Sequence, residues 1–329
     1  MTQPFSVLST YPFSTTDLAE LQAAAQTDVQ CVATREGLLS RLPDAEILCS
    51  YWIPDNWREL APNLRWLQVA GGGVDGLRAT GLLDAESDVL VTTAVGIHAY
   101  MVGEYVFGSM LMFNRSWPQM IQLQDQQIWP QSPSWYKLER RELFGQTLGI
   151  IGLGHIGRRV AQLGKAFGMR VLATRRSTLT VEQGTEGALV DVMYPMRLLK
   201  TMLSQCDYIV LAVPLTPETK KLISEAELRV MKSNAYLVNV ARGQIVDEKS
   251  LIRALKEHWI GGAGLDVTEK EPLPLDSPLF KLPNVILTPH ISGESINYGK
   301  RLATLFADNL RRYRAGEPLR NLYDSARGY

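Results

Sequence analysis

The chain has 329 residues, of which 46% are hydrophobic and 21% charged, the composition of an ordinary water-soluble globular protein. Lys and Arg together number 34, as do Asp and Glu, so the formal net charge is zero. A neutral chain is not typical of proteins that bind nucleic acid or an anionic membrane through charge. Because the length exceeds that of a typical single core, we expect two domains.

The three cysteines, Cys31, Cys49 and Cys206, lie far apart in the sequence and form no C-x-x-C pair. This spacing predicts buried free thiols rather than a disulfide framework or a metal site. The first residues, MTQPFSVLSTYPF, lack the basic segment and long apolar core of a secretory signal. No apolar run approaches the roughly eighteen residues of a transmembrane helix. We therefore expect a cytoplasmic protein that has no membrane partner.

Residues 1–97 have the pattern of a small α/β unit, in which short apolar runs alternate with helical periodicity. One helix is expected to run from a cap at Thr16 or Asp17 through Gln26, and a second over Glu36–Leu42. The expected strands are Phe5–Leu8, Val29–Ala33, Ile47–Ser50, Leu64–Ala70 and Val89–Thr92.

A run of three glycines, Gly71, Gly72 and Gly73, directly follows the fourth of these strands. Because these residues lack Cβ atoms, their backbone N–H groups are free to form an anion-binding concavity. Ligands of open α/β sheets bind at the carboxyl ends of strands, where this run lies. The pattern favours an anion site, and a flexible turn is the alternative.

A long apolar helix is expected over His98–Phe113, and a stretch rich in Trp, Gln and Pro follows it. This stretch contains Trp117, Trp129 and Trp135. An exposed arm that buries such aromatic side chains against a second subunit would make the protein a homodimer.

The most specific motif follows the apolar run Leu148–Ile151. Gly152, Gly154 and Gly157 have G-x-G-x-x-G spacing, a helical pattern comes next, and Met169–Ala173 is a second expected strand. In this context the glycines permit a tight turn, close approach of a pyrophosphate and close packing of the helix on the strand. The segment predicts a dinucleotide site, with a glycine-rich turn of another α/β protein as the alternative.

The residues after the second strand indicate which dinucleotide is bound. An NAD site usually has Asp or Glu here, whereas this chain has Thr174, Arg175, Arg176 and Ser177. Guanidinium and hydroxyl groups suit a ribose 2′-phosphate, which Arg binds through charge-assisted hydrogen bonds. We therefore predict NADP, with NAD possible and a solvated basic turn as the alternative.

Strands and helices continue to alternate after a polar surface excursion at Thr178–Gly187. This alternation predicts a doubly wound parallel sheet with helices on both faces. The expected strands are Tyr208–Val213, Tyr236–Val240, Gly261–Val267 and Val285–Thr288, and the expected helices are Leu198–Gln205, Ser224–Met231, Glu248–His258 with a cap at Asp247, and residues 294–315.

Arg242, Glu271 and His290 follow three consecutive predicted strands. Because the carboxyl ends of parallel strands meet at one edge of a sheet, all three side chains can reach one crevice. Each has an ordinary structural alternative, as a carbonyl cap, a solvated turn residue or a hydrogen-bonded loop histidine. Their joint placement is what favours a catalytic site. The other histidines, His98, His155 and His258, are weaker candidates.

The stretch from about Gly71 to Gly293 resembles the D-isomer-specific 2-hydroxyacid dehydrogenase family. The motifs that carry the resemblance are AGGGVDG at 70–76, Glu104 in the long apolar helix, GLGHIG at 152–157, CDYIVLAVPLTPET at 206–219, VNVARGQIVDE at 238–248, GLDVTEKEP at 264–272 and TPHISG at 288–293. The basic turn after the second strand resembles the NADP-preferring glyoxylate and hydroxypyruvate reductase branch. The chain departs from the family pattern at Ser292 and in the longer segment 178–200.

The resemblance implies a role for each candidate residue. His290 would be the general acid, Glu271 its carboxylate partner, and Arg242 the donor that holds the substrate and polarises its carbonyl. The backbone of Gly72 and Gly73 would bind the substrate carboxylate. The implied cofactor contacts are Gly152, Gly154, His155, Ile156, Gly157, Thr174, Arg175, Arg176, Ser177, Val213, Pro214, Thr219, Val240, Ala241, Asp266, His290 and Gly293, with Asp266 on the nicotinamide carboxamide.

The resemblance also implies an architecture and an activity. A Rossmann-type cofactor domain over residues 98–293 would be inserted in a flavodoxin-like substrate domain formed by residues 1–97 and 294–329. The implied reaction is NADPH-dependent reduction of a small 2-oxo acid, of the glyoxylate or hydroxypyruvate type, to a D-2-hydroxy acid. The alternatives are a dehydrogenase of another small anion, such as phosphite or formate, and a dinucleotide-sensing protein of the corepressor type.

Overall fold

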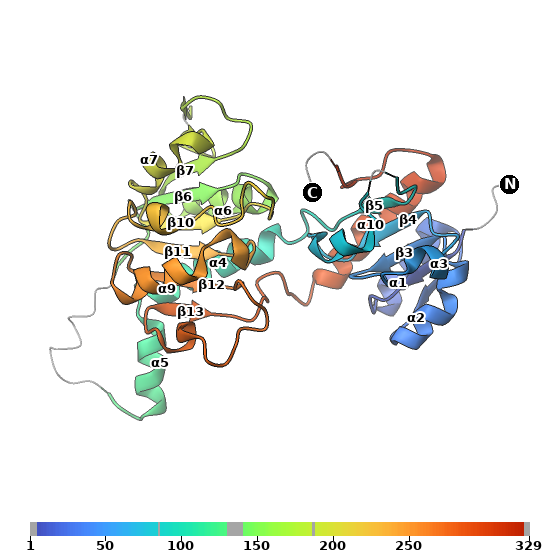
Figure 1. Cartoon of the computed structure of the whole chain (residues 1–329), viewed down its shortest axis with the longest axis horizontal. Helices are drawn as coiled ribbons and strands as arrows, with labels where there is room; N and C mark the ends of the chain where they lie inside the picture. The colour runs from blue at the N-terminus through green and yellow to red at the C-terminus, as the bar shows by residue number, and fades with distance from the viewer. Residues whose placement is uncertain (1–4, 85, 130–140, 186–187, 326–329) are drawn as a thin grey trace. The chain divides into compact units, whose positions relative to one another are not determined.

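The computed structural model describes residues 5–84, 86–129, 141–185 and 188–325 (Figure 1). Trp135 of the expected arm lies outside these residues. The chain divides into two compact units, and each is described by itself. Unit 1 comprises Met1–His98 and Glu294–Tyr329, and unit 2 comprises Ala99–Gly293.

Unit 1 is built on a five-stranded parallel sheet with the order β2-β1-β3-β4-β5. This order is that of flavodoxin-like sheets, as predicted. The strands are β1 (Val7–Ser9), β2 (Val29–Cys31), β3 (Ile47–Ser50), β4 (Trp66–Val69) and β5 (Leu90–Thr92), and the helices are α1 (Thr15–Ala25), α2 (Arg35–Arg41), α3 (Trp57–Leu60) and α10 (Tyr298–Ala315).

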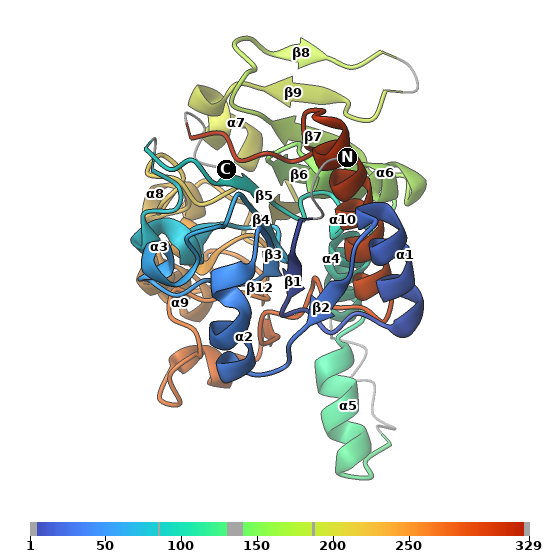
Figure 2. The same ribbon diagram turned by 90° about the vertical axis from the view of Figure 1, so that its right-hand side faces the viewer.

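Helices cover both faces of the unit 1 sheet because consecutive strand residues point to opposite sides. Trp66 of β4 packs its ring against Phe306 and Tyr313 of α10, at centroid distances of 5.4 and 5.5 Å. Its neighbour Leu67 belongs to the core on the other face, together with Leu38 of α2. Figure 2 shows α1 and α10 side by side, which agrees with the contacts between them.

Unit 2 is built on an eight-stranded sheet with the order β13-β12-β11-β10-β6-β7-β9-β8. Counted from β6, the chain first moves through β7 to β9 and then returns to β10 on the other side, so the sheet is doubly wound with a switch point between β6 and β10. The strands are β6 (Thr147–Ile151), β7 (Arg170–Thr174), β8 (Glu182–Gln183), β9 (Val192–Tyr194), β10 (Tyr208–Leu211), β11 (Tyr236–Asn239), β12 (Gly262–Leu265) and β13 (Val285–Leu287).

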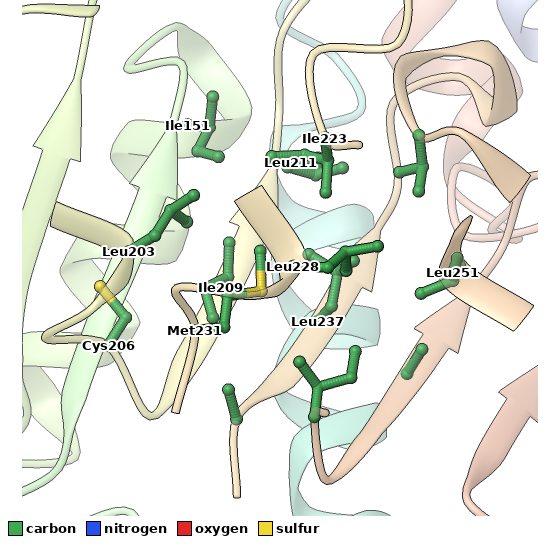
Figure 3. Close-up of a cluster of buried hydrophobic side chains, with 14 of the residues drawn as sticks. Ile151, Leu203, Cys206, Ile209, Leu211, Ile223, Leu228, Met231, Leu237 and Leu251 are labelled. Atoms are coloured by element: carbon green, nitrogen blue, oxygen red, sulfur yellow. The ribbon is translucent and has the colours of Figure 1, made fainter. Parts of the chain in front are cut away.

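The two faces of the unit 2 sheet have separate apolar cores. Along β10, Tyr208 and Val210 belong to one core, whereas Ile209 and Leu211 belong to the other. The first core is completed by α4 (Ala99–Asn114) and α6 (His155–Ala166), and the second by α7 (Leu199–Leu203), α8 (Glu225–Leu228) and α9 (Glu248–Lys256). Figure 3 shows the second core, where Ile209 and Leu211 lie among side chains of the covering helices.

Several local predictions are wrong. Helix α1 is capped by Ser14 rather than Thr16 or Asp17, because the Ser14 side chain accepts a hydrogen bond from the Asp17 backbone N–H. The helix expected over Ser224–Met231 is only the short α8, and its capping box joins Ser224 to Glu227. His258 lies beyond the end of α9 in a left-handed conformation.

One further expectation is wrong, and one short strand was not predicted. Cys31 is exposed at the edge of unit 1, whereas Cys49 and Cys206 are buried free thiols as expected. The polar excursion at Thr178–Gly187 contains β8, which pairs antiparallel with β9 and extends the sheet edge. A two-residue strand with both residues exposed leaves no apolar alternation to predict it from.

Helix α5 (Trp117–Asp125) follows α4 and extends away from the unit 2 sheet in both views (Figures 1 and 2). None of its residues is buried, and Trp117 and Ile121 are about half exposed. Within the described part of the chain, every helix is too short or too polar to span a membrane.

Candidate functional site

The glycine turn lies at the switch point of the unit 2 sheet, between the end of β6 and the start of α6. Gly152 has a φ of +97°, and a Cβ there would lie 2.5 Å from the Ala212 carbonyl oxygen. A Cβ on Gly157 would lie 2.0 Å from the Gly152 carbonyl oxygen, so α6 packs directly on the turn. A Cβ on Gly154 would have no atom within 4 Å, which leaves open space over the turn.

Helix α6 directs its N-terminus toward this open space. Gly154 is its N-cap, His155 follows it and is exposed, and Ile156 is partly buried. The first N–H groups of a helix have no acceptor within the helix and carry its positive dipole end, so they attract an anion such as a pyrophosphate. The cradle over Gly154 therefore fits a dinucleotide.

The basic turn follows β7, the strand beside β6. Arg175, Arg176 and Ser177 are exposed between the buried Thr174 and Thr178. The Oγ1 atoms of both threonines are buried and make no hydrogen bond to the described residues. These five side chains carry only hydroxyl or guanidinium groups and no carboxylate, and such a donor set fits a phosphate group.

The loop after β10 forms the other side of the switch point. A Cβ on Gly152 would lie 2.6 Å from a methyl carbon of Val213, so this side chain borders the glycine turn. Thr219 shapes the loop, since its Oγ1 donates to the Pro214 carbonyl and accepts from the Thr216 N–H, both at 2.7 Å. Val213 thus borders the glycine turn, and Thr219 holds the loop that also contains Pro214.

The three candidate catalytic residues follow β11, β12 and β13, which are parallel neighbours. Asn239, Leu265 and Leu287 are partners at the carboxyl ends of these strands, so the strands end level with one another. Arg242 and His290 come three residues after their strands, and the loop after β12 carries Glu271 to the same edge.

His290 and Glu271 are in direct contact. The distance between His290 Nδ1 and Glu271 Oε2 is 2.8 Å, and the side chains are 48% and 39% exposed. The second carboxylate oxygen, Oε1, accepts a hydrogen bond from the Thr268 N–H at 3.1 Å. The carboxylate is therefore fixed by its own loop, and Nε2 of the imidazole makes no hydrogen bond to the residues that the structure describes.

Arg242 is placed by the turn that follows β11. The buried Asn239 side chain accepts from the Ala241 N–H at 3.1 Å and donates to the Arg242 carbonyl at 3.0 Å. A Cβ on Gly243 would lie 1.9 Å from the Thr268 carbonyl group. This close approach brings the Arg242 turn against the loop that holds Glu271.

Asp266 is 1% exposed and directly follows β12. Its carboxylate accepts hydrogen bonds from Thr288, Ile291 and Ser292, which flank His290. Val240, Ala241 and Gly293, the remaining expected cofactor contacts of this edge, belong to the same loops.

The glycine run expected to bind the substrate carboxylate belongs to unit 1, where it follows β4. A Cβ on Gly72 would lie 3.4 Å from the His98 ring, and one on Gly71 would lie 3.5 Å from Tyr51. The Tyr298 hydroxyl of α10 donates to the carbonyl of Ala70, the residue before the run. Aromatic side chains thus lie beside Gly71 and Gly72 and hold the residue before them.

Several residues that hold the candidate site in place were not predicted from the sequence. Asn239 organises the Arg242 turn, Thr268 fixes Glu271, and Thr288 contacts Asp266. A polar residue at the end of an apolar strand, such as Asn239 after Tyr236–Val238, was the available signal.

Comparison with known proteins agrees with this architecture. Residues 107–292 match the family model described as D-isomer specific 2-hydroxyacid dehydrogenase, NAD binding domain. Over its full length the chain is similar to the crystal structure of a D-isomer specific 2-hydroxyacid dehydrogenase from Xanthobacter autotrophicus Py2 in complex with NADPH and MES. The TM-score is 0.81 at 30% identity, and the match covers 99% of this chain and 100% of the other.

Two curated relatives are similar along most of the chain. The glyoxylate reductase of Korarchaeum cryptofilum is 35% identical over 297 residues, which cover 88% of this chain and 86% of the relative. The glyoxylate reductase of Pyrococcus furiosus is 37% identical over 299 residues, which cover 86% and 83%. The protein is thus an NAD(P)-binding oxidoreductase and belongs to the D-isomer specific 2-hydroxyacid dehydrogenase family.

Proposed function

We propose that this protein uses NADPH to reduce a small 2-oxo acid, of the glyoxylate or hydroxypyruvate type, to a D-2-hydroxy acid. The observation that carries the proposal is the contact between His290 and Glu271, 2.8 Å long, at the sheet edge that also bears Arg242. The names of the two glyoxylate reductases, each similar over more than four fifths of this chain, support the substrate class.

In this proposal His290 is the general acid. An ionised Glu271 only accepts hydrogen bonds, so the His290 Nδ1 atom carries the proton of their contact and the protonated imidazole also carries one on Nε2. His290 gives the Nε2 proton to the substrate oxygen as the carbonyl becomes a hydroxyl group. The nicotinamide, when bound, supplies the hydride. Glu271 orients the ring and stabilises its charge before transfer.

Arg242 is the electrophilic partner in the proposal. Its guanidinium has only donors, so it can bind the substrate carboxylate or carbonyl oxygen and stabilise the negative charge that develops there. Asn239 and Gly243 hold its turn against the Glu271 loop, which limits how far Arg242 can move from the His290 pair. The expected roles of Gly72 and Gly73 in substrate binding stay predictions.

The preference for NADPH rests on the basic turn after β7. Arg175, Arg176 and Ser177 are exposed there, and the buried hydroxyl groups of Thr174 and Thr178 make no hydrogen bond to the described residues. A 2′-phosphate would bind the exposed side chains, whereas the free 2′-hydroxyl of NAD would find no carboxylate acceptor in this turn. The glycine cradle would bind the pyrophosphate of either dinucleotide.

The direct test is the oxidation of NADPH and NADH in the presence of glyoxylate, hydroxypyruvate, pyruvate or phenylpyruvate. We expect NADPH-linked turnover that falls by at least about a hundredfold in His290→Gln, while NADPH binding is retained. A matched control is His258→Gln, which changes a histidine beyond the end of α9. Turnover by His290→Gln at the wild-type rate would remove His290 as the acid. Tight binding without turnover would favour a dinucleotide sensor.

We also propose that α5 packs against a second copy of the chain. A nine-residue helix with no buried residue has little stability of its own, and Trp117 and Ile121 expose apolar surface along it. Sedimentation equilibrium should show a dimer that Ile121→Glu converts to a monomer. Phe280→Glu is the control, because Phe280 is similarly exposed in another part of unit 2. A monomeric wild type would contradict the proposal.

A further inference from the structure

A single buried carboxylate holds the segment that carries His290. Asp266 Oδ1 accepts hydrogen bonds from Thr288 Oγ1 at 2.6 Å and from the Ile291 N–H at 2.9 Å, and Oδ2 accepts from the Ser292 N–H at 2.9 Å. The Asp266 backbone carbonyl also accepts from the His290 N–H at 2.8 Å. The bonds reach residues on both sides of His290, so Asp266 fixes the whole turn.

This turn has a conformation that the surroundings must maintain. His290 has a φ of +57°, in the left-handed region that is unfavourable for a residue with a Cβ atom. Such a residue keeps its conformation only where neighbouring contacts determine it. A change in those contacts would rotate the His290 backbone and move the imidazole away from Glu271.

The network extends from Asp266 to helix α4. The Tyr105 hydroxyl lies 2.7 Å from Thr288 Oγ1, and Thr288 gives its only hydroxyl proton to the Asp266 carboxylate. Tyr105 must therefore be the donor to Thr288, which makes a chain of donors that runs from Tyr105 through Thr288 to Asp266. Burial raises the pKa of Tyr105 to about 12, so the phenol keeps its proton at neutral pH.

We infer that Tyr105 and Thr288 are positioning residues for the proposed reduction, because they orient Asp266 and through it the left-handed turn that aims His290. The inference rests on the proposed role of His290 as the acid. Neither residue needs to touch substrate or cofactor. Tyr105 fixes the hydroxyl of Thr288, and this hydroxyl fixes one oxygen of Asp266.

The test compares Tyr105→Phe, Thr288→Val and Thr288→Ser in steady-state reduction of glyoxylate with NADPH. We expect kcat to fall roughly tenfold in Tyr105→Phe and up to about a hundredfold in Thr288→Val, with the KM of both substrates nearly unchanged, since misplacement of a catalytic group affects the chemical step. The solvent isotope effect on kcat should rise, because proton donation becomes slower. Thr288→Ser keeps the hydroxyl and should restore most of kcat.

The matched control is Tyr208→Phe. The Tyr208 hydroxyl also donates a 2.7 Å hydrogen bond to a residue of α4, but its acceptor is Asn114, which makes no contact with the His290 turn among the described bonds. This variant should lose similar stability and keep wild-type kcat and solvent isotope effect. If Tyr105→Phe behaves like Tyr208→Phe in both kinetic measurements, the positioning role is overturned.

A readout without turnover separates this inference from the proposed function. The chain has four histidines, so the ¹⁵N signal of His290 Nδ1 can be assigned by its loss in His290→Gln. Tyr105→Phe should shift that signal and Tyr208→Phe should leave it in place. If wild-type protein reduces none of the 2-oxo acids, the proposed function fails and the signal alone decides the positioning role. An unshifted signal in Tyr105→Phe overturns it.

Discussion

Two glycines of the same turn should respond differently to alanine. A Cβ on Gly157 would lie 2.0 Å from the Gly152 carbonyl oxygen and 3.2 Å from a methyl carbon of Ile150, so these atoms must separate by about 1.4 Å to reach ordinary contact. A Cβ on Gly154 meets nothing within 4 Å. The first substitution therefore tests packing, and the second tests the space in which we expect the pyrophosphate.

The magnitudes follow from these contacts. Overpacking costs about 1–3 kcal/mol, and Gly157→Ala should lie at the upper end because the opposing atom belongs to the backbone. At about 2–4 °C per kcal/mol for a domain of this size, Tm should fall by roughly 6–12 °C. Gly154→Ala replaces an N-cap glycine and should cost about 1 kcal/mol or less. Its NADPH affinity should nevertheless fall about tenfold or more, because a loss of about 1.4 kcal/mol of binding free energy already lowers affinity tenfold.

Thermal unfolding without cofactor and calorimetric titration with NADPH measure the two effects separately. A Gly157→Ala protein that melts within about 1 °C of wild type would refute the packing argument. Wild-type affinity in Gly154→Ala would show that the pyrophosphate does not occupy the space over this glycine.

Two further variants test charge. Changing both Arg175 and Arg176 to Ala should lower kcat/KM roughly a hundredfold for NADPH and little for NADH, because each exposed guanidinium contributes about 1.5 kcal/mol to phosphate binding. The control Arg253→Ala should leave the ratio of the two kcat/KM values unchanged. Equal losses with both cofactors would contradict the 2′-phosphate assignment. Asp247→Asn should lower the free energy of unfolding at pH 7 by about 1 kcal/mol, because a 2.8 Å contact with the half-exposed Lys221 lowers the pKa of Asp247 from 3.8 to about 2. A carboxyl group whose pKa is lower in the folded protein than in the unfolded chain stabilises the fold at pH values above its unfolded pKa. The stability difference between wild type and Asp247→Asn should therefore shrink as pH falls from 4 to 2. Urea unfolding curves of the two proteins that stay equally far apart at pH 4 and pH 2 would contradict this prediction.

The buried parallel strands were predictable because short, continuous apolar runs are typical of strands that are buried on both faces. Strand β6 is the expected strand Leu148–Ile151 with Thr147 added at its start, and β3 is the expected strand Ile47–Ser50 without change. The Asp247 cap of α9 is confirmed, since its side chain accepts from the Ser250 N–H. Capping side chains and apolar runs act within a few residues, so a single sequence contains the information that places them.

The candidate site was predictable only in part. The strand order brings Arg242, Glu271 and His290 to one edge, and the parallel-sheet rule predicts that edge from the sequence. The contact between Tyr105 and Thr288 joins residues 183 positions apart, and nothing local in either segment indicates it. The left-handed φ of His290 likewise depends on bonds that Asp266 makes across the fold.

The discontinuity of unit 1 has a consequence for biosynthesis. Trp66 is covered by Phe306 and Tyr313 of α10, which are made only after all of unit 2. At about 5–20 residues per second, a ribosome needs on the order of ten to forty seconds to cross that interval. During this time Trp66 in the first segment of unit 1, Met1–His98, has no α10 to cover it, whereas the continuous unit 2 that follows can fold first. A nascent chain released early would expose apolar surface near its N-terminus, and holdase chaperones would be expected to bind it there.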